Sequence, residues 1–263
     1  MNSPEIETLF ARTLLGGYEG EDAWEAVSAL RQDGSPEIFE RAAAWCVSDD
    51  ALKRARAADI LCQLRHAGVT DTLWEKPQWM FRDESYTLIT NLLENENDPD
   101  ALRSVISALG HMGDAASVPQ ILRYQDHPNN DVRFAVTFAL GCFPNDPQSV
   151  GGLLKLTTDS DAEVRDWAVF GLGVQGDVDS TEVREALLRC LDDADEDVRE
   201  EAAVGLGKRR DQRLLPKLKT MLDQPKLNIR VAEAAAALLG LDKDPPEWIA
   251  TDYRAALINK FGV

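Results

Sequence analysis

One eleven-residue frame recurs along this chain and restricts its fold more than any other feature. The frame reads acidic residue, Val, Arg, two variable residues, two small or apolar residues, one variable residue, a small residue, Leu and Gly. Full copies span Asp131–Gly141, Glu163–Gly173 and Asp197–Gly207, and looser copies end at Gly110 and Gly240. The frame glycines are therefore 31, 32, 34 and 33 residues apart. A fixed period of this length is the signature of stacked supersecondary repeats.

The frame continues upstream with its glycine replaced, and the equivalent positions are Arg31 and Cys62. The longer gap between Cys62 and Gly110 predicts an insertion near 66–83, which contains Trp74 and Trp79. These copies make seven units. We therefore expect a single domain over 1–263, with an N-terminal cap at 1–20, repeats over 21–240 and a C-terminal capping helix over 241–263.

Each unit reads as two helices. The first has apolar residues at helical spacing, as in Val183, Leu187 and Leu191. A short acidic link suits the start of the second helix, and the frame glycine is expected to end it in a left-handed conformation. Because one helix pair cannot bury its apolar face alone, the pairs must stack. The sequence predicts an all-α fold, a right-handed α-solenoid (α/α superhelix) of about seven helix pairs, with these leucines in its core: Leu109, Leu140, Leu172 and Leu206.

The charge of the chain restricts its partners. The formal net charge is −18, and the segment from Asp159 to Glu201 alone holds 15 acidic and 4 basic residues. Such a field repels nucleic acid and anionic lipid and attracts basic proteins. No apolar run approaches the roughly 20 residues of a membrane span, and the N-terminus lacks a secretory signal. We expect a cytoplasmic protein with a basic protein partner, no nucleic acid and no membrane.

No recognisable motif for catalysis, metal binding or cofactor binding is present. We therefore expect no catalytic residues, no metal and no cofactor. The four cysteines are expected to be buried core thiols: Cys46, Cys62, Cys142 and Cys190. The basic segment Lys208–Arg210 fits the C-terminal end of a helix, where cations are favoured, and phosphate contact is its alternative interpretation.

The repeated frame, with its Leu-Gly and following Gly-Asp, resembles bacterial HEAT-like repeats of the phycobilisome-lyase type, from about Asp22 to Gly240. Three segments, Glu40–Asp50, Val164–Phe170 and Asp197–Asp211, are similar to enterobacterial HEAT-repeat proteins that are often labelled lyases. Some of those proteins are found beside Rhs-type polymorphic toxins. The resemblance implies a cytoplasmic immunity protein that neutralises a toxin domain. By label it also implies a lyase or a lyase subunit, and a generic assembly scaffold is the third hypothesis.

In HEAT-like stacks the second helices line the concave face. We expect the residues seven, six and three positions before each frame glycine to point outward from the core. They form an aromatic group followed by an acidic group, and an aromatic anchor beside a charged rim suits a protein interface. The alternative is that the aromatic rings pack between repeats and the acids are only a solvated face. The predicted partner-binding residues are Phe134, Phe138, Asp166, Trp167, Phe170, Glu200, Glu201 and Glu233.

The frame arginines Arg133, Arg165 and Arg199 have two interpretations. They form a ladder of ion pairs between repeats, because each follows an acidic residue and the next repeat supplies another. Alternatively they form a ladder that binds anions. We favour the structural ladder. The oligomeric state is open at this point.

Overall fold

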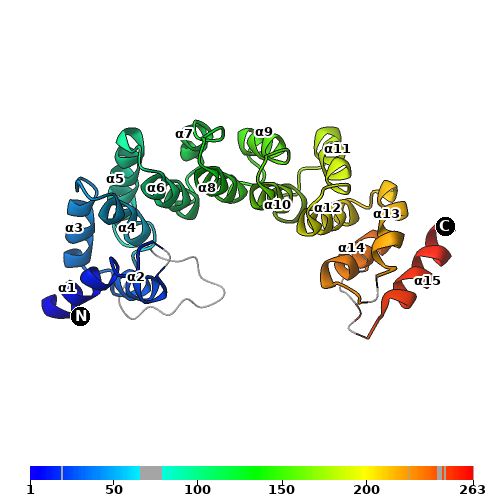
Figure 1. Ribbon diagram of the computed structural model, residues 1–263, viewed down its shortest axis with the longest axis horizontal. Coiled ribbons are helices and arrows are strands. Elements are labelled where there is room, and N and C mark those ends of the chain that lie inside the picture. The colour runs from blue at the N-terminus through cyan, green and yellow to red at the C-terminus, as the bar shows by residue number, and fades with distance from the viewer. Residues whose placement is uncertain (19, 66–78, 225, 242–244, 246, 263) are drawn as a thin grey trace. The chain divides into compact units, whose positions relative to one another are not determined.

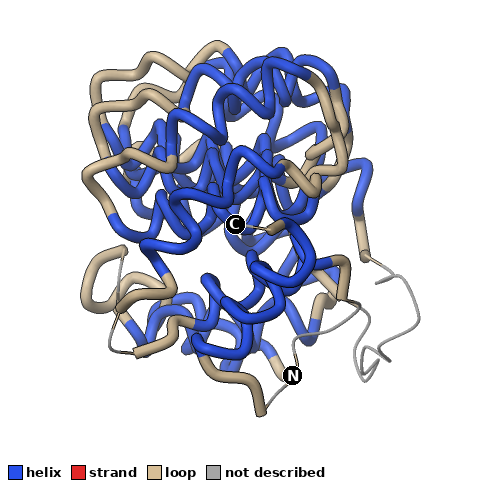
Figure 2. The backbone as a smooth tube through the Cα atoms, turned by 90° about the vertical axis from the view of Figure 1, so that its right-hand side faces the viewer, coloured by secondary structure: helices blue, strands red, loops and turns tan. Residues whose placement is uncertain are grey.

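The computed structural model describes the whole chain except residues 19, 66–78, 225, 242–244, 246 and 263. The described part is built from α-helices, with short 3-10 and π turns, and contains no strand (Figures 1 and 2). The one strand-like feature there is an isolated antiparallel bridge between Arg65 and Trp79. The predicted all-α repeat fold is confirmed.

The chain divides into two compact units, Met1–Cys142 and Phe143–Val263. The first contains four helix pairs, and its second helices α2, α4, α6 and α8 pack against one another in chain order. The helices are α1 (Ser3–Arg12), α2 (Glu21–Asp33), α3 (Pro36–Trp45), α4 (Ala51–Leu61), α5 (Arg82–Asn95), α6 (Pro99–Met112), α7 (Val118–Leu122) and α8 (Asn130–Gly141).

The second unit contains three helix pairs and a final helix. The second helices α10, α12 and α14 pack side by side, and α15 packs against α14 (Figure 1). The helices are α9 (Pro147–Leu156), α10 (Ala162–Phe170), α11 (Thr181–Cys190), α12 (Glu196–Lys208), α13 (Leu215–Met221), α14 (Ile229–Leu239) and α15 (Ala250–Phe261). A π turn over Gly171–Gln175 prolongs α10. The seven pairs of the two units match the seven units of the sequence.

The second helices begin where the acidic links predict. In all of them except α2, which follows Gly20, a side-chain oxygen of the residue before the helix accepts hydrogen bonds from backbone N–H groups of the first turn, which otherwise have no partner within the helix. These N-cap residues are Asp50, Asp98, Asn129, Asp161, Asp195 and Asn228.

The prediction that the frame glycines end the second helices in a left-handed conformation is wrong at four of five positions. Only Gly240 has that conformation, with φ +76°. Gly110 and Gly207 lie inside helices, Gly141 is the last residue of α8 without a positive φ, and Gly173 lies in the π turn. A Cβ atom on Gly207 would lie 2.5 Å from the carbonyl oxygen of Ala234. Glycine at this position therefore allows two neighbouring second helices to approach closely.

The predicted core is largely confirmed. The frame leucines Leu109, Leu140, Leu172 and Leu206 are buried, as are three of the cysteines. Cys142 is exposed, contrary to prediction, because it follows the last residue of α8.

The predicted insertion near 66–83 falls mostly outside the described residues, Trp74 included. The described part of the insertion begins at Trp79 and continues directly into α5. Separately, none of the helices described combines the length and the apolar character that a membrane crossing requires.

Candidate functional site

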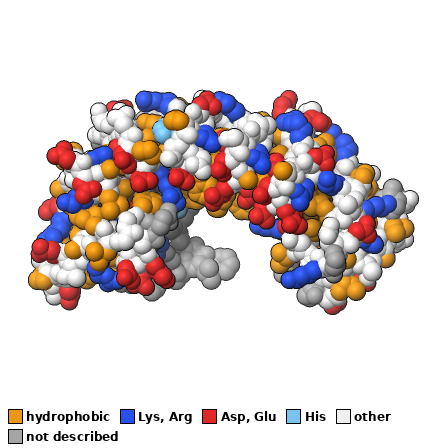
Figure 3. All heavy atoms as spheres, in the orientation of Figure 1, with side chains coloured by type: hydrophobic (Ala, Val, Ile, Leu, Met, Phe, Trp, Pro, Cys, Tyr) orange, Lys and Arg blue, Asp and Glu red, His pale blue; other side chains and the backbone are white. Residues whose placement is uncertain are grey.

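Acidic side chains gather on the second helices of the second unit. Asp166 lies on α10, Glu200 and Glu201 on α12, and Glu233 on α14. The space-filling view shows carboxylates over α10 and α12 (Figure 3). Because these helices pack side by side, their like charges are held close together in a partly desolvated place.

One cation from the chain itself lies among these acids. Arg230, at the start of α14, donates from Nη2 to Oε1 of Glu201 at 2.9 Å and from Nη1 to Oε2 of Glu233 at 3.1 Å. Its guanidinium carbon lies 6.0 Å from the centre of the Phe170 ring. The site therefore already accommodates one guanidinium group between carboxylates and an aromatic ring.

Arg230 leaves part of the acidic group without a partner. Oδ1 of Asp166 and Oε2 of Glu201 are buried, and neither has a hydrogen-bond partner among the described residues. A buried polar atom without a partner costs about 1–3 kcal/mol, and more when it is charged. These two oxygens are positions where a donor from outside the chain would be stabilised.

Burial and mutual repulsion change how these carboxyls titrate. Burial raises the pKa of Glu201 to about 7; Arg230 opposes this, and Asp166, Glu233 and Glu200 add to it. Burial raises the pKa of Asp166 to about 6, with further repulsion from Asp197 and Asp195. A bound cation would favour the charged form of both carboxyls, so binding and proton release are linked.

The predicted aromatic residues divide between the two units. Trp167 and Phe170 lie on α10, half-buried, with ring centres 5.8 Å apart in an edge-to-face arrangement. Phe134 and Phe138 lie on α8 of the first unit and are also half-buried. The ring centre of Phe138 is 5.0 Å from that of His111. The second unit thus brings together six of the eight predicted partner-binding residues.

The prediction that three positions per frame point outward needs correction. The position six residues before the frame glycine is buried in most repeats, because it faces the neighbouring second helix. The buried residues there are Arg56, Ser104, Ala135, Glu201 and Ala234. Glu200 is also buried, with 5% of its surface exposed, against 7% for Glu201. These two acids are therefore not a merely solvated face.

The frame arginines are anchored to the backbone in the same way. Arg165 forms a two-point ion pair with Asp193, which precedes the next second helix. Nη1 of Arg133, Arg165 and Arg199 donates to backbone carbonyls before its own helix. In the described residues the ladder of ion pairs does not reach Arg199, because the chain has Lys226 where the next repeat would supply its acid.

In the basic segment Lys208–Arg210, the guanidinium of the central residue is occupied by bonds within the chain, which argues against phosphate binding there. Arg209 is buried and donates to the carbonyl oxygens of Leu172, Gly173, Gly176 and Val178. These hydrogen bonds therefore stabilise the backbone of the π turn and of the residues that follow it.

Sequence reasoning missed Arg230, which stands ten residues before Gly240, at the position where the three full copies of the frame have an acidic residue. It also missed the ion pair of Arg54 with Glu96, although Arg54 stands eight residues before Cys62, as Arg133 stands before Gly141. The frame register was the signal that could have found it. Among the described residues, no group of three His, Cys, Asp or Glu side chains is arranged to hold a metal ion.

Comparisons with known proteins agree with this architecture. The family model for HEAT repeats matches residues 86–173 and 150–239. YibA of Escherichia coli is 22% identical and has a similar fold, with a TM-score of 0.72 over 98% of this chain and 92% of that one. Importin beta is 14% identical with a TM-score of 0.58, over 90% of this chain and 39% of that one.

The complex of CpcE and CpcF of phycocyanin lyase from Nostoc sp. PCC7120 is 15% identical, with a TM-score of 0.48 over 97% of this chain and 94% of that one. No curated protein matches the chain in sequence. Because the repeat model covers more than half of the residues, the chain belongs to the HEAT-repeat family.

Proposed function

We propose that this HEAT-repeat protein is a non-catalytic binding protein that holds a basic protein partner on the α10, α12 and α14 face of its second unit. One observation carries the proposal: the buried oxygens of Asp166 and Glu201 that have no hydrogen-bond partner among the described residues. Like charges held together without full compensation lower stability, and such positions are typical of functional sites.

The chemistry of the partner follows from the same residues. Arg230 demonstrates that a guanidinium group fits between carboxylates and the Phe170 ring. Trp167 and Phe170 supply half-buried aromatic surface next to the acids, and aromatic residues in partly desolvated surroundings are typical anchors of protein interfaces. The net charge of −18 steers cationic proteins towards the chain.

In its sharpest form, the proposal is that the partner is a toxin domain of the Rhs type and that the chain is its immunity protein. The support for this form is the resemblance of Glu40–Asp50, Val164–Phe170 and Asp197–Asp211 to HEAT-repeat proteins found beside such toxins. HEAT repeats generally mediate protein binding, so an inhibitor and an assembly scaffold use the same surface in different ways.

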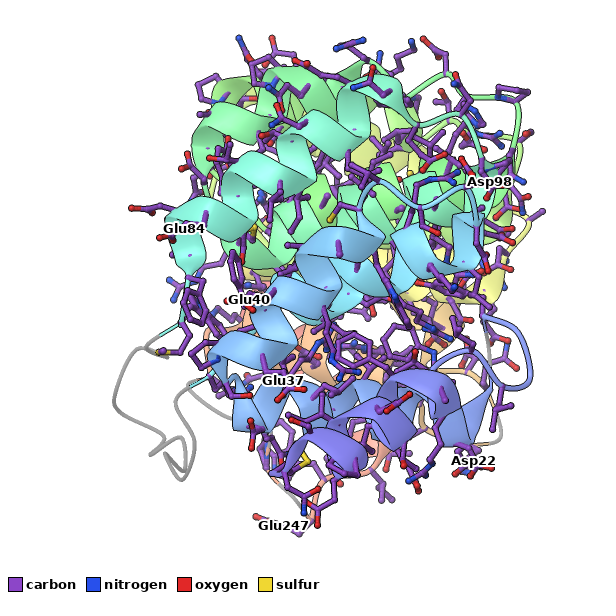
Figure 4. All side chains as sticks on the ribbon, turned by 90° about the vertical axis from the view of Figure 1, so that its left-hand side faces the viewer. Asp22, Glu37, Glu40, Glu84, Asp98 and Glu247 are labelled. Carbon is purple, nitrogen blue, oxygen red and sulfur yellow. The ribbon has the colours of Figure 1, made fainter. Side chains whose placement is uncertain are left out.

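Affinity capture with matched variants tests the proposal. The Asp166→Asn, Glu201→Gln double variant removes two charges with almost no change in shape. The control, Glu84→Gln with Glu182→Gln, removes two charges from exposed positions on the first helices α5 and α11; Figure 4 shows Glu84 directed away from the helices. The comparison is made at pH 8, where the carboxyls replaced in both variants are mostly ionised and the two variants therefore have nearly the same net charge.

Wild type and control are expected to retain one basic protein that high salt releases. The site variant is expected to capture at least about tenfold less of that protein. Equal retention by the site variant would contradict the proposal. Loss of the partner's own toxic activity in the complex would identify an immunity protein, and an unchanged activity would identify a scaffold.

A further inference from the structure

Two arginines of the frame hold a carboxylate in the same way. Nε and Nη2 of Arg54 donate to the two carboxylate oxygens of Glu96 at 2.6 and 2.9 Å. Nε and Nη2 of Arg165 donate to those of Asp193, both at 2.8 Å. In each case the arginine lies four residues after its N-cap, and the acid lies two residues before the N-cap of the next second helix.

The third of these arginines, Arg199, is anchored like the other two. Its Nη1 donates to the carbonyl oxygens of Asp193 and Ala194, both at 2.8 Å. The Nη1 of Arg165 makes the equivalent bonds to Asp159 and Ser160. This anchor fixes the plane of the guanidinium, so the Nε and Nη2 edge of Arg199 is held in a pose ready for a carboxylate.

The acid that this edge needs is missing from the chain. The equivalent position, two residues before the N-cap Asn228, is Lys226. In the described residues, Nε and Nη2 of Arg199 have no acceptor. Glu196 and Glu200 lie nearby, but neither forms an ion pair with Arg199 in this part of the chain. Arg199 and Lys226, two cations, therefore stand where the pairs Arg54–Glu96 and Arg165–Asp193 each have a cation and an anion.

Arg199 lines a groove of about 850 Å³ between α12, α13 and α14. Lys217 and Lys226 also line it, together with Met221, Leu227 and Ile229. Ile229 is 78% exposed and adds apolar surface next to these charged groups. The groove is large and partly apolar, so it fits a stretch of polypeptide better than a small acid.

We propose that the Nε and Nη2 edge of Arg199 receives an Asp or Glu side chain of a bound polypeptide, whose apolar neighbours cover Ile229. The ligand replaces the carboxylate that Glu96 and Asp193 supply in the earlier repeats. This site adjoins the acidic cluster at Glu200, but it takes a ligand of the opposite charge, so it does not depend on the proposed function.

Nuclear magnetic resonance of the arginine Nε–H groups tests the proposal in the full chain. The probes are a capped five-residue peptide with one glutamate between leucines, its glutamine counterpart, acetate and inorganic phosphate. Arg54 and Arg165 are internal controls, because their Nε and Nη2 groups already donate to carboxylates of the chain. The key variants are Lys226→Asp, which supplies the missing carboxylate from the chain, and Lys226→Asn, which has the same shape without the charge.

The glutamate peptide is expected to shift the Arg199 signal with an affinity on the order of tenfold above that of the glutamine peptide, while Arg54 and Arg165 stay unchanged. Lys226→Asp should weaken peptide binding at least about tenfold, and Lys226→Asn less than about threefold. The Asp166→Asn, Glu201→Gln variant should bind the peptide normally, which separates this test from that of the proposed function.

Three results would each overturn the proposal. The first is equal binding of the glutamate and glutamine peptides. The second is equal weakening by Lys226→Asp and Lys226→Asn. The third is a response to acetate or phosphate as strong as that to the glutamate peptide, which would indicate an anion site without preference for a polypeptide.

Discussion

In the first unit, the guanidinium of Arg56 is fully buried and has a partner on every side. Arg56 donates to the carbonyl oxygens of Thr13, Gly17 and Tyr18 and to Oδ2 of Asp59, at 2.7–3.1 Å. The rings of Tyr18 and Trp24 lie 4.9 and 4.8 Å from its guanidinium carbon. In the second unit, the equivalent position six residues before the frame glycine is Glu201, and half of its carboxylate has no partner among the described residues.

The contrast separates two uses of a buried charge. Where every donor and acceptor is satisfied, as around Arg56, the charge joins α4 to the loop after α1 and fixes the fold. Where acids repel one another and oxygens remain without partners, as around Glu201, the arrangement lowers stability. Proteins keep such positions where a ligand compensates them.

The largest expected effect comes from breaking the satisfied site. Arg56→Met should lower the free energy of unfolding by about 3–5 kcal/mol, because it leaves Asp59 buried without its cation. Urea denaturation followed by far-ultraviolet circular dichroism measures the change. A loss below about 1 kcal/mol would mean that Arg56 is not the structural charge described here.

Core truncation should not distinguish the two units. Leu140→Ala in the first unit and Leu206→Ala in the second should each cost about 2–5 kcal/mol, since both side chains are fully buried. The same denaturation experiment compares them. A cost in one unit several times that in the other would show that the repeats do not share one type of core.

Relieving the unsatisfied site should stabilise the protein. The pKa of Glu201 is raised to about 7 and that of Asp166 to about 6, so the unfolded chain loses these protons at lower pH than the folded one. Stability from these groups is therefore present below the unfolded pKa values and is lost as pH rises towards 7. Asp166→Asn with Glu201→Gln should gain on the order of 1 kcal/mol at pH 8.

The same double variant should gain nothing near pH 4, where both wild-type carboxyls are protonated in the folded protein. Denaturation at the two pH values, with Glu84→Gln and Glu182→Gln as the control pair, measures the difference. A variant that is destabilised at pH 8 would show that these carboxylates stabilise the fold.

The smallest expected effect is at the interrupted ion-pair ladder. Lys226→Asp should stabilise the second unit by roughly 0.2–1 kcal/mol, because it gives Arg199 the partner that Arg165 already has. Lys226→Asn should give less than half of that gain. Thermal unfolding at low and high salt measures both, and a gain that does not fall with salt would speak against a new ion pair.

The sequence predicts the helix pairs and the core because both follow from local pattern. Asp161 and Asp195 cap helices through neighbouring backbone groups, and Leu206 is buried through the frame period. The role of Gly207 could not be predicted, because its close contact with Ala234 depends on how neighbouring helices approach each other.

The acidic residues of the site could be predicted from the sequence, but their contacts with one another and with Arg230 could not. The frame register identified Glu200, Glu201 and Glu233, whereas Arg230 reaches Glu201 only through the packing of α14 on α12. Which carboxylate oxygens lack partners depends on that packing as well, so residue spacing alone could not show it.

The most direct test of the account is a carboxyl titration of Asp166 and Glu201 by nuclear magnetic resonance, with and without a hexa-arginine peptide. In the free protein Glu201 should titrate near pH 7 and Asp166 near pH 6. With the peptide bound, both midpoints should fall by at least about one pH unit, because a cation between the carboxylates favours their charged form. Unchanged midpoints in the presence of the peptide would contradict the claim that this face receives a cationic partner.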